Sequence, residues 1–220
     1  AQDQLVQIDL PDNTTVTYRY DAFGRRIEKN VAGTITRYVY DGVAIALEFA
    51  GSDNMLVARY SHGDGIDQPL SVERDGQRFF FHADHLGAIR ALTNTSGVAV
   101  NTYAYDTYGR LEVIGNEGGV NPFTYTGREY DTESGLYYYR ARYYDPQVGR
   151  FISQDPIGFL GKDANIFAYV RGNPIHFVDP FGMLSSDFFT RTLPEAAERI
   201  FLPSGPLGAL GTATTILGGA

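Results

Sequence analysis

The sequence contains no cysteine and no tryptophan, and its 26 acidic residues outnumber its 18 lysines and arginines. The absence of cysteine excludes disulfides, thiol nucleophiles and zinc sites built from cysteine ligands. The net charge of −8 argues against a nucleic-acid-binding surface, which would need clustered lysine and arginine side chains. We therefore expect no nucleic acid among the partners of this part of the chain.

A signal for Sec-dependent export is also missing from the first residues, AQDQLVQIDLPDNTTV, which have neither a basic nor an apolar region. The sequence starts in the middle of a strand-like pattern. We therefore expect a fragment of a longer protein, in which a signal could lie upstream. The 220 residues, 43% of them hydrophobic, are enough to bury a core in one or two domains.

Aromatic and turn-forming residues are abundant, with 16 tyrosines, 14 phenylalanines and 25 glycines. This composition is typical of a β-rich protein with many turns. One unit recurs: residues 18–25 read YRYDAFGR and residues 103–110 read YAYDTYGR, while residues 38–42 form a shortened copy, YVYDG. A repeated unit of this kind predicts a repeated structural element.

Each copy of the repeat predicts a β-hairpin. Two tyrosines that are two positions apart point to the same face of a strand. The aspartate opens a turn by accepting backbone N–H bonds, the glycine supplies a positive φ, and the arginine starts the return strand. Alternating polar and apolar residues at 15–20 and 98–103 support this interpretation. The predicted fold class is all-β, with almost no helical signal before residue 185.

The character of the sequence changes near residue 183. Leu193–Phe201 predicts a short helix, which Pro203 and Gly205 end. The sixteen residues of Gly205–Ala220 are small and apolar, and as a helix they would be about 24 Å long. This is short of the roughly 20 apolar residues that cross a bilayer, so a membrane role for residues 205–220 stays open.

Several long motifs follow one another between residues 123 and 182. They are YTGREYD at 125–131, GLYYYRARYYDP at 135–146, GRFISQDPIG at 149–158, NIFAYVRGNP at 165–174 and DPFG at 179–182. The segment HADHLGAIR at 82–90 precedes them. This order of motifs resembles the Rhs (rearrangement hotspot) repeat-associated core domain, and the resemblance covers roughly residues 15–183.

The resemblance implies a shell. In Rhs proteins and in the C components of Tc toxin complexes, YD repeats form a β-sheet that spirals around the toxin. It implies a shell segment at 1–121, a compact core or plug at 122–183, and the start of the toxin region at 184–220. The enclosed toxin would be the principal partner, alongside secretion-apparatus (type VI) or Tc-complex components and an immunity protein.

The same resemblance implies a secreted bacterial effector or cell-surface protein that is made in the cytoplasm. Teneurins share the YD shell but use it for cell adhesion. A non-catalytic adhesion scaffold is therefore the alternative function, as is a carbohydrate-binding repeat in which the tyrosines stack on sugars. Cross-strand packing explains the tyrosines without a ligand, and we favour it.

Asp155 and Asp179 open two copies of one motif, D-P-x-G. Two carboxylates that lie close enough to share a proton can supply both the base and the acid of peptide hydrolysis. Read on its own, D-P-x-G is an ordinary turn. Arg150, five residues before Asp155, is a candidate to orient one carboxylate or to hold a developing oxyanion.

The resemblance adds an aspartyl autoprotease that cuts its own chain once, just after the second D-P-x-G motif. The bond implied is Met183–Leu184, with Gly182–Met183 as the second choice. The family usually has leucine where Met183 stands, and methionine has a similar volume. Asp163 could be a supporting acid, but a solvated turn is the favoured interpretation.

Two further expectations concern the histidines and the N-terminal strand region. The four histidines show no spacing that suits a metal, and we expect hydrogen-bonding roles for them and neither metal nor cofactor. We expect a free sheet edge near residues 1–20, where Thr14–Tyr18 is β-prone, uncharged and free of proline, the profile of an edge that invites pairing.

Overall fold

The first half of the chain forms one sheet of eleven strands, in which each strand pairs antiparallel with the next in sequence. Its strands are β1 (Gln7–Asp9), β2 (Thr15–Tyr20), β3 (Arg26–Val31), β4 (Thr34–Asp41), β5 (Ala44–Ala50), β6 (Leu56–His62), β7 (Pro69–Arg74), β8 (Gln77–Ala83), β9 (Ile89–Asn94), β10 (Ala99–Tyr105) and β11 (Leu111–Ile114). This computed structural model describes residues 4–114, 121–161, 163–183 and 186–187. The all-β prediction is confirmed.

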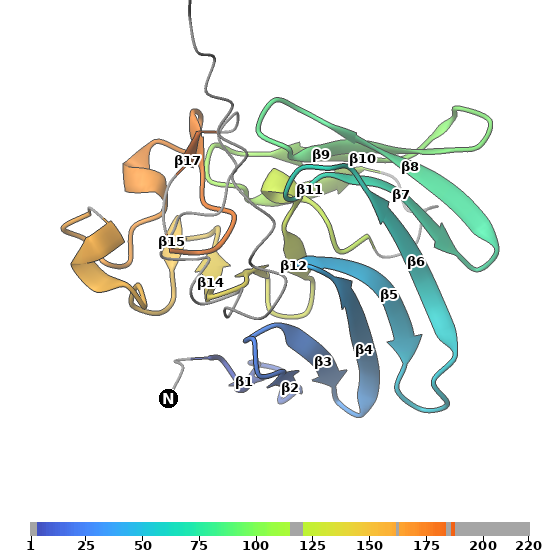
Figure 1. The fold of residues 1–220 in the computed structure, drawn as a ribbon, viewed down its shortest axis with the longest axis horizontal. Coiled ribbons are helices and arrows are strands. Elements are labelled where there is room, and N and C mark those ends of the chain that lie inside the picture. The colour runs from blue at the N-terminus through green and yellow to red at the C-terminus, as the bar shows by residue number, and fades with distance from the viewer. Residues whose placement is uncertain (1–3, 115–120, 162, 184–185, 188–220) are drawn as a thin grey trace, which may run out of the picture.

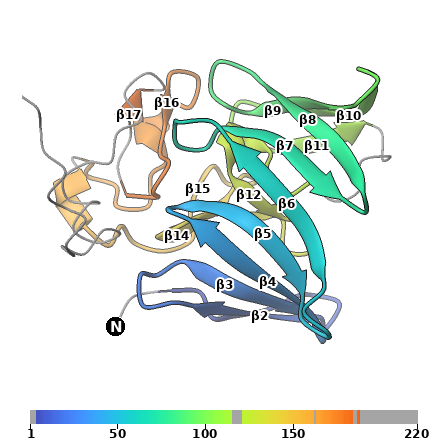
Figure 2. The same ribbon diagram turned by 45° about the vertical axis from the view of Figure 1, so that its right-hand side comes forward.

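Shorter elements follow the large sheet. They are the four strands β12 (Glu129–Asp131), β13 (Leu136–Tyr139), β14 (Arg142–Asp145) and β15 (Arg150–Phe151), the pair β16 (Phe177–Val178) and β17 (Ser186–Asp187), and the 3-10 turns η1 (Tyr125–Gly127), η2 (Gly158–Gly161) and η3 (Val170–Gly172). The large sheet curves around β12–β15 in both views (Figure 1 and Figure 2). We call the β1–β11 sheet the wall and residues 121–183 the plug.

The aspartate of each full repeat builds its hairpin turn. Asp21 Oδ1 accepts the backbone N–H groups of Phe23 and Arg25, both at 2.9 Å, and Gly24 has a φ of 78°. Asp106 does the same for the N–H groups two and four residues later, also at 2.9 Å. The predicted hairpins are confirmed, and so are the roles predicted for the aspartate and the glycine in their turns.

Two more turns use the same device without the tyrosines. Asp84 Oδ1 accepts the N–H groups of Leu86 and Ala88, at 2.9 and 3.1 Å, and Gly87 has a φ of 78°. Asn94 Oδ1 likewise accepts the N–H groups two and four residues later, both at 3.0 Å. The turn therefore depends on Asp or Asn followed three residues later by glycine. The tyrosines of the Y-x-Y pattern precede only some of these turns.

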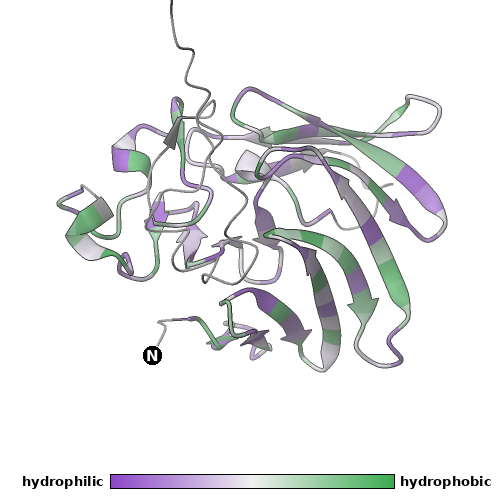
Figure 3. Cartoon of the chain, viewed as in Figure 1, coloured by the Kyte–Doolittle hydropathy of each residue, from purple (hydrophilic) through white to green (hydrophobic). Residues whose placement is uncertain are grey.

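The repeat tyrosines point to the face of the wall that meets the plug. Tyr18 and Tyr20 pack in one cluster with Tyr138 and Tyr143 of the plug. Hydrophilic and hydrophobic residues alternate along wall strands such as β5 and β6 (Figure 3). Within the plug, the most deeply placed rings, those of Tyr137, Tyr139 and Tyr144, are 0% exposed. Rings without exposed surface contribute to core packing, as predicted, and are not accessible for stacking on a sugar.

A buried ionic cluster joins the wall to the plug. Arg26 on β3 is 1% exposed, and its guanidinium bonds Asp131 Oδ2 at 2.5 Å and Glu129 Oε2 at 2.8 Å. Lys29 adds an ion pair to Asp131 at 3.0 Å. Burial raises the pKa of Asp131, but Arg26 and Lys29 lower it by more, so the net shift is downward. The carboxylate therefore stays ionised inside the protein.

The sheet ends within residues 1–20, as expected, but Thr14–Tyr18 is not its edge. Thr15–Tyr20 forms β2, which pairs with β3 on one side and with β1 on the other. The outermost strand at this end is Gln7–Asp9, where Gln7 lies opposite Thr17 and Ile8 opposite Val16. A short strand with an aspartate at its end is a poorer template for pairing than Thr14–Tyr18 would be.

The predicted helix at 193–201 and the apolar segment at 205–220 lie outside the described residues. In the part of the chain that the structure describes, no helix has the length and apolarity to cross a membrane.

Replacing Asp131 by asparagine should lower the free energy of unfolding by about 3–5 kcal/mol, because Arg26 keeps its charge and stays buried without this counter-ion. Glu73→Gln is the control, since the Arg78–Glu73 pair is exposed and should contribute at most about 1 kcal/mol. Urea unfolding of the three proteins measures both values. Equal losses in the two variants would contradict the role given to the buried cluster.

Candidate functional site

Both D-P-x-G motifs form turns, as their composition alone predicts. Asp155 Oδ1 accepts the N–H of Ile157 at 3.0 Å, and Asp179 Oδ1 accepts the N–H of Met183 at 3.0 Å. The glycine of each turn has a positive φ, 55° in the first and 65° in the second. Turn formation thus involves the Oδ1 atom of each carboxylate.

The Oδ2 atoms of the two carboxylates meet at one guanidinium group. Arg142 Nη2 lies 3.0 Å from Asp155 Oδ2 and 3.6 Å from Asp179 Oδ2. The side chains of Arg142 and Asp179 are 2% and 3% exposed, and that of Asp155 is 9% exposed. The structure therefore brings together the two aspartates that the sequence singled out, and it places a cation between them.

Arg142 is held on every side. Its Nε donates to the carbonyl of Gly182, and its Nη1 donates to the carbonyl of Ile166 at 3.0 Å. The guanidinium carbon also lies 3.7 Å from the centre of the Phe151 ring. A planar group with five donors suits this position, because a lysine could not reach the carboxylates and both carbonyls at once.

Arg150 is not at this site. It is exposed, lies on β15, and lines a separate cavity of about 350 Å³ with Val148, Phe167 and three other residues. Sequence proximity to Asp155 suggested Arg150, whereas the arginine that the fold supplies is Arg142, thirteen residues before Asp155. No local pattern in the sequence indicated Arg142, because Asp155 and Asp179 lie far from it along the chain.

A small cavity of about 20 Å³ lies against the aspartates. It is lined by Arg142, Asp155, Gly158, Asp163, Asn165, Ile166, Ala168, Val170, Arg171, Asp179 and Met183. A cavity needs roughly 10–15 Å³ to hold one water molecule. Asp163 also forms a turn, since its Oδ1 accepts the N–H of Asn165 at 2.9 Å. The site therefore has room for a single water beside two carboxylates.

The electrostatics of the site raise the pKa of Asp155 and lower that of Arg142. Burial raises the pKa of Asp155 above its usual range, and the attraction of Arg142 and the Ile157 N–H only partly offset this. Burial also lowers the pKa of Arg142, while Asp179 and Asp155 act in the opposite direction. One cation between two carboxylates leaves one negative charge uncompensated.

The segment of the predicted cut runs through the site. The peptide group that joins Gly182 to Met183 is bound at both ends: its carbonyl accepts from Arg142, and its N–H donates to Asp179. Met183 is 1% exposed. Leu184, the other side of the first-choice bond, lies outside the described residues.

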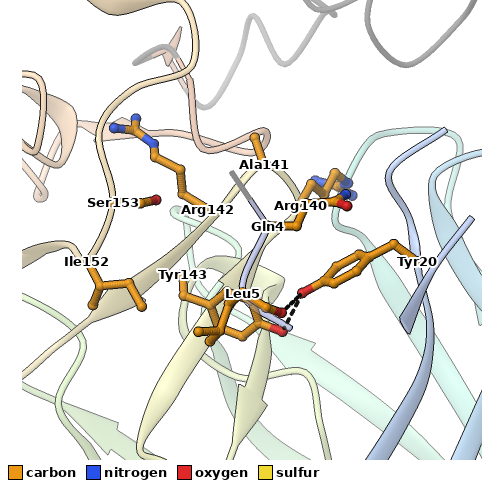
Figure 4. A pocket seen from close by; sticks show the side chains of 9 residues that line it. All are labelled: Gln4, Leu5, Tyr20, Arg140, Ala141, Arg142, Tyr143, Ile152 and Ser153. Atoms are coloured by element: carbon orange, nitrogen blue, oxygen red, sulfur yellow. Dashed lines mark hydrogen bonds between the residues drawn. The ribbon is translucent and has the colours of Figure 1, made fainter. Parts of the chain in front are cut away.

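A larger cavity, of about 340 Å³, is also lined by Arg142 (Figure 4). Tyr20 reaches across it from β2, donates to the carbonyl of Leu5 at 2.6 Å, and has its hydroxyl 3.4 Å from that of Tyr143. Neither Asp155 nor Asp179 lines this cavity. We therefore place the candidate chemistry in the smaller one.

The histidines make separate hydrogen bonds. The Nε2 atom of His62 lies 2.8 Å from a carbonyl of β5, and that of His82 lies 2.9 Å from Thr93 Oγ1. His176 Nδ1 lies 2.9 Å from Asn173 Oδ1. Among the described residues, no cluster of three or more histidines, aspartates or glutamates has the geometry to hold a metal ion.

Most of this chain is similar in sequence to known proteins. Residues 1–168 match the family described as Teneurin YD-shell, so the match includes Asp155 and stops before Asp179. The tRNA3(Ser)-specific nuclease WapA of Bacillus spizizenii is 37% identical over 83% of this chain. Double-stranded DNA deaminase toxin A of Burkholderia cenocepacia is 31% identical over 84% of it. The chain spans 8% and 15% of the lengths of these two proteins.

Solved structures share the fold. The crystal structure of TcdB2-TccC3-TEV matches 83% of this chain and 10% of that chain, with a TM-score of 0.68 and 23% sequence identity. A likeness at this identity concerns the arrangement of the strands and not the chemistry of the site.

Proposed function

Because the chain belongs to the teneurin YD-shell family, we propose that it is the part of a polymorphic toxin that encloses the toxin region and cuts the chain before it. One observation carries the first half of this proposal. The matching segment is common to a protein named as a tRNA nuclease and to one named as a DNA deaminase. A segment shared by proteins of different activities suits a common task, such as enclosing a cargo, better than either activity.

The cargo in this proposal is the region that begins at residue 184, and the whole protein is a secreted effector. The face of the wall that carries the repeat tyrosines packs against the plug. This packing supports an enclosing role. The plug then closes the wall just before the cargo begins.

The cut is proposed to be hydrolysis by the Asp155–Asp179 pair. Water in the small cavity loses a proton to the ionised carboxylate while its oxygen attacks the scissile carbonyl carbon. The other carboxyl is protonated and supplies a proton, so that the C–N bond breaks and an amine leaves. Asp155 is the candidate for this role because its pKa is raised. The products are a new carboxyl terminus and a new amino terminus, and the reaction occurs once per chain.

The contacts of the segment support Met183–Leu184 as the bond that is cut. Arg142 holds the Gly182 carbonyl and Asp179 holds the Met183 N–H, which fixes the chain up to Met183. The Met183–Leu184 bond is the next peptide bond along the chain. Arg142, and not Arg150, is the positioning residue of the proposal.

The region after the proposed cut remains bonded to the plug. The β16 strand pairs with β17, so that Phe177 lies opposite Asp187 and Val178 opposite Ser186. These backbone hydrogen bonds join residues on the two sides of the Met183–Leu184 bond. Cutting that bond therefore does not by itself detach the C-terminal part of the chain.

Asp155→Asn and Asp179→Asn should each abolish cutting in the full-length protein, because asparagine keeps the size of the side chain but cannot carry the proton. The two act as one unit, so the double variant should be no worse than either single one. Asp145→Asn is the control, since Asp145 opens another Asp-Pro turn but lines a different cavity. Denaturing gels and N-terminal sequencing measure the cut, which should expose Leu-Ser-Ser-Asp-Phe.

Efficient cutting of either single variant would refute the carboxylate pair. A wild-type protein of intact mass would instead favour the adhesion scaffold.

The cutting rate should fall as the pH rises through the elevated pKa of Asp155, because the acid then loses its proton. It should also fall at lower pH, where the pair no longer contains a free carboxylate to accept a proton from water. Refolding the full-length protein from denaturant into buffers of different pH gives the profile, and tyrosine fluorescence reports folding in each buffer. A rate that keeps increasing toward alkaline pH would speak against an acid in the mechanism.

After cutting, the C-terminal fragment should elute with the shell under native conditions and separate from it only in denaturant. The β16–β17 pairing and enclosure by the wall are the physical reasons. Size-exclusion chromatography of the cut full-length protein is the measurement. A shell peak without the C-terminal fragment would end the enclosure proposal even if the carboxylate pair proved correct.

A further inference from the structure

The segment leading to the proposed cut is held by the turn of the β13–β14 hairpin. Three successive carbonyls, those of residues 180–182, are bound by three successive residues of the turn. Arg140 Nη1 donates to Pro180, the Ala141 N–H donates to Phe181 at 3.2 Å, and Arg142 donates to residue 182. Such matched contacts fix the register of the segment as a β-ladder would.

The glycine in this segment permits the close approach. A Cβ atom at Gly182 would lie 2.5 Å from the Tyr139 carbonyl oxygen, and its φ is 65°. The segment therefore lies against the hairpin with no space for a side chain. A shift by one residue would bring a larger side chain to this point.

The two arginines of the hairpin turn are anchored differently. Arg142 is anchored by the carboxylate pair itself, whereas Arg140 is anchored by Asp67, which belongs to the wall. Arg140 Nη2 lies 2.7 Å from Asp67 Oδ1, and its Nη1 lies 3.3 Å from Asp67 Oδ2. This two-point contact sets the plane of the guanidinium and points Nη1 at Pro180.

Asp67 lies in the wall loop between β6 and β7, and its side chain is 3% exposed. It also bonds Arg128 of the plug at 2.6 Å. Gly127 next to Arg128 has space only for hydrogen, because a Cβ atom there would lie 2.5 Å from the Asp67 carbonyl oxygen. One wall carboxylate is thus the counter-ion of two buried plug arginines.

We propose that Asp67 is a positioning residue for the cut, through which the wall sets the register of the segment in front of the carboxylate pair. This inference rests on the proposed autoproteolysis. Without the wall loop, Arg140 is a buried cation lacking this partner, and its hold on Pro180 loses its direction. Cutting then depends on the wall having closed on the plug, which delays it until the shell is built.

The test compares Asp67→Asn with Asp131→Asn in the full-length protein. Asp131 is an equally buried carboxylate between wall and plug, but it contacts Arg26 and Lys29 and not the hairpin turn. Both proteins are refolded from denaturant under conditions in which both fold, and the C-terminal fragment is followed by gel and by mass. The rate and the position of the cut are the two readouts.

Asp67→Asn should slow the cut by about 100-fold, the effect of misplacing reacting groups by about 1 Å, and should spread it over neighbouring bonds. Asp131→Asn should cut at the wild-type bond and within a few-fold of the wild-type rate. Wild-type rate and position in Asp67→Asn would overturn the inference, and so would equal slowing in both variants. If Asp67→Asn does not fold, Arg140→Lys decides in the same way, because lysine keeps the charge but lacks the fork.

Failure of this inference can be told apart from failure of the proposed function. A wild-type protein that stays intact, or an Asp179→Asn variant that is cut, removes the proposed function and the role of Asp67 with it. Normal cutting of Asp67→Asn, alongside an uncut Asp179→Asn, removes only the role of Asp67.

Discussion

The structure depends on buried arginines whose counter-ions lie on the opposite side of the wall–plug boundary. Arg26 of the wall pairs with Asp131 and Glu129 of the plug, and Arg128 and Arg140 of the plug both pair with Asp67 of the wall. Each charge is too costly to bury alone, and each finds these partners across the boundary. These ion pairs therefore stabilise the association of the wall with the plug.

The same rule shapes the candidate site. Arg142 touches both Asp155 and Asp179, and it keeps two buried carboxylates within reach of each other. A single cation cannot fully neutralise two carboxylates, and burial raises the pKa of Asp155. The ion pairs that stabilise the fold thus also hold two carboxylates beside a cavity with room for one water.

The D-P-x-G turns have two functions at once, which explains why their sequence alone was ambiguous. In each turn, Oδ1 of the aspartate accepts a backbone N–H, as in many ordinary turns, and Oδ2 faces Arg142. Asp145 opens a similar turn through its Oδ1, but it lines a different cavity from the pair. Turn chemistry is local, whereas the chemistry of the pair needs both turns to meet.

The sequence by itself determined the all-β class, the hairpins of the Y-x-Y-D-x-x-G-R repeat and the two D-P-x-G turns, because strand alternation and Asx turns involve residues only a few positions apart. Only the tertiary structure decided that Arg142 and not Arg150 joins the aspartates, that β1 covers β2, and that Asp67 supports Arg140. These contacts connect residues far apart in the chain, and burial sets their partners. No local pattern encodes which distant charge a buried arginine will meet.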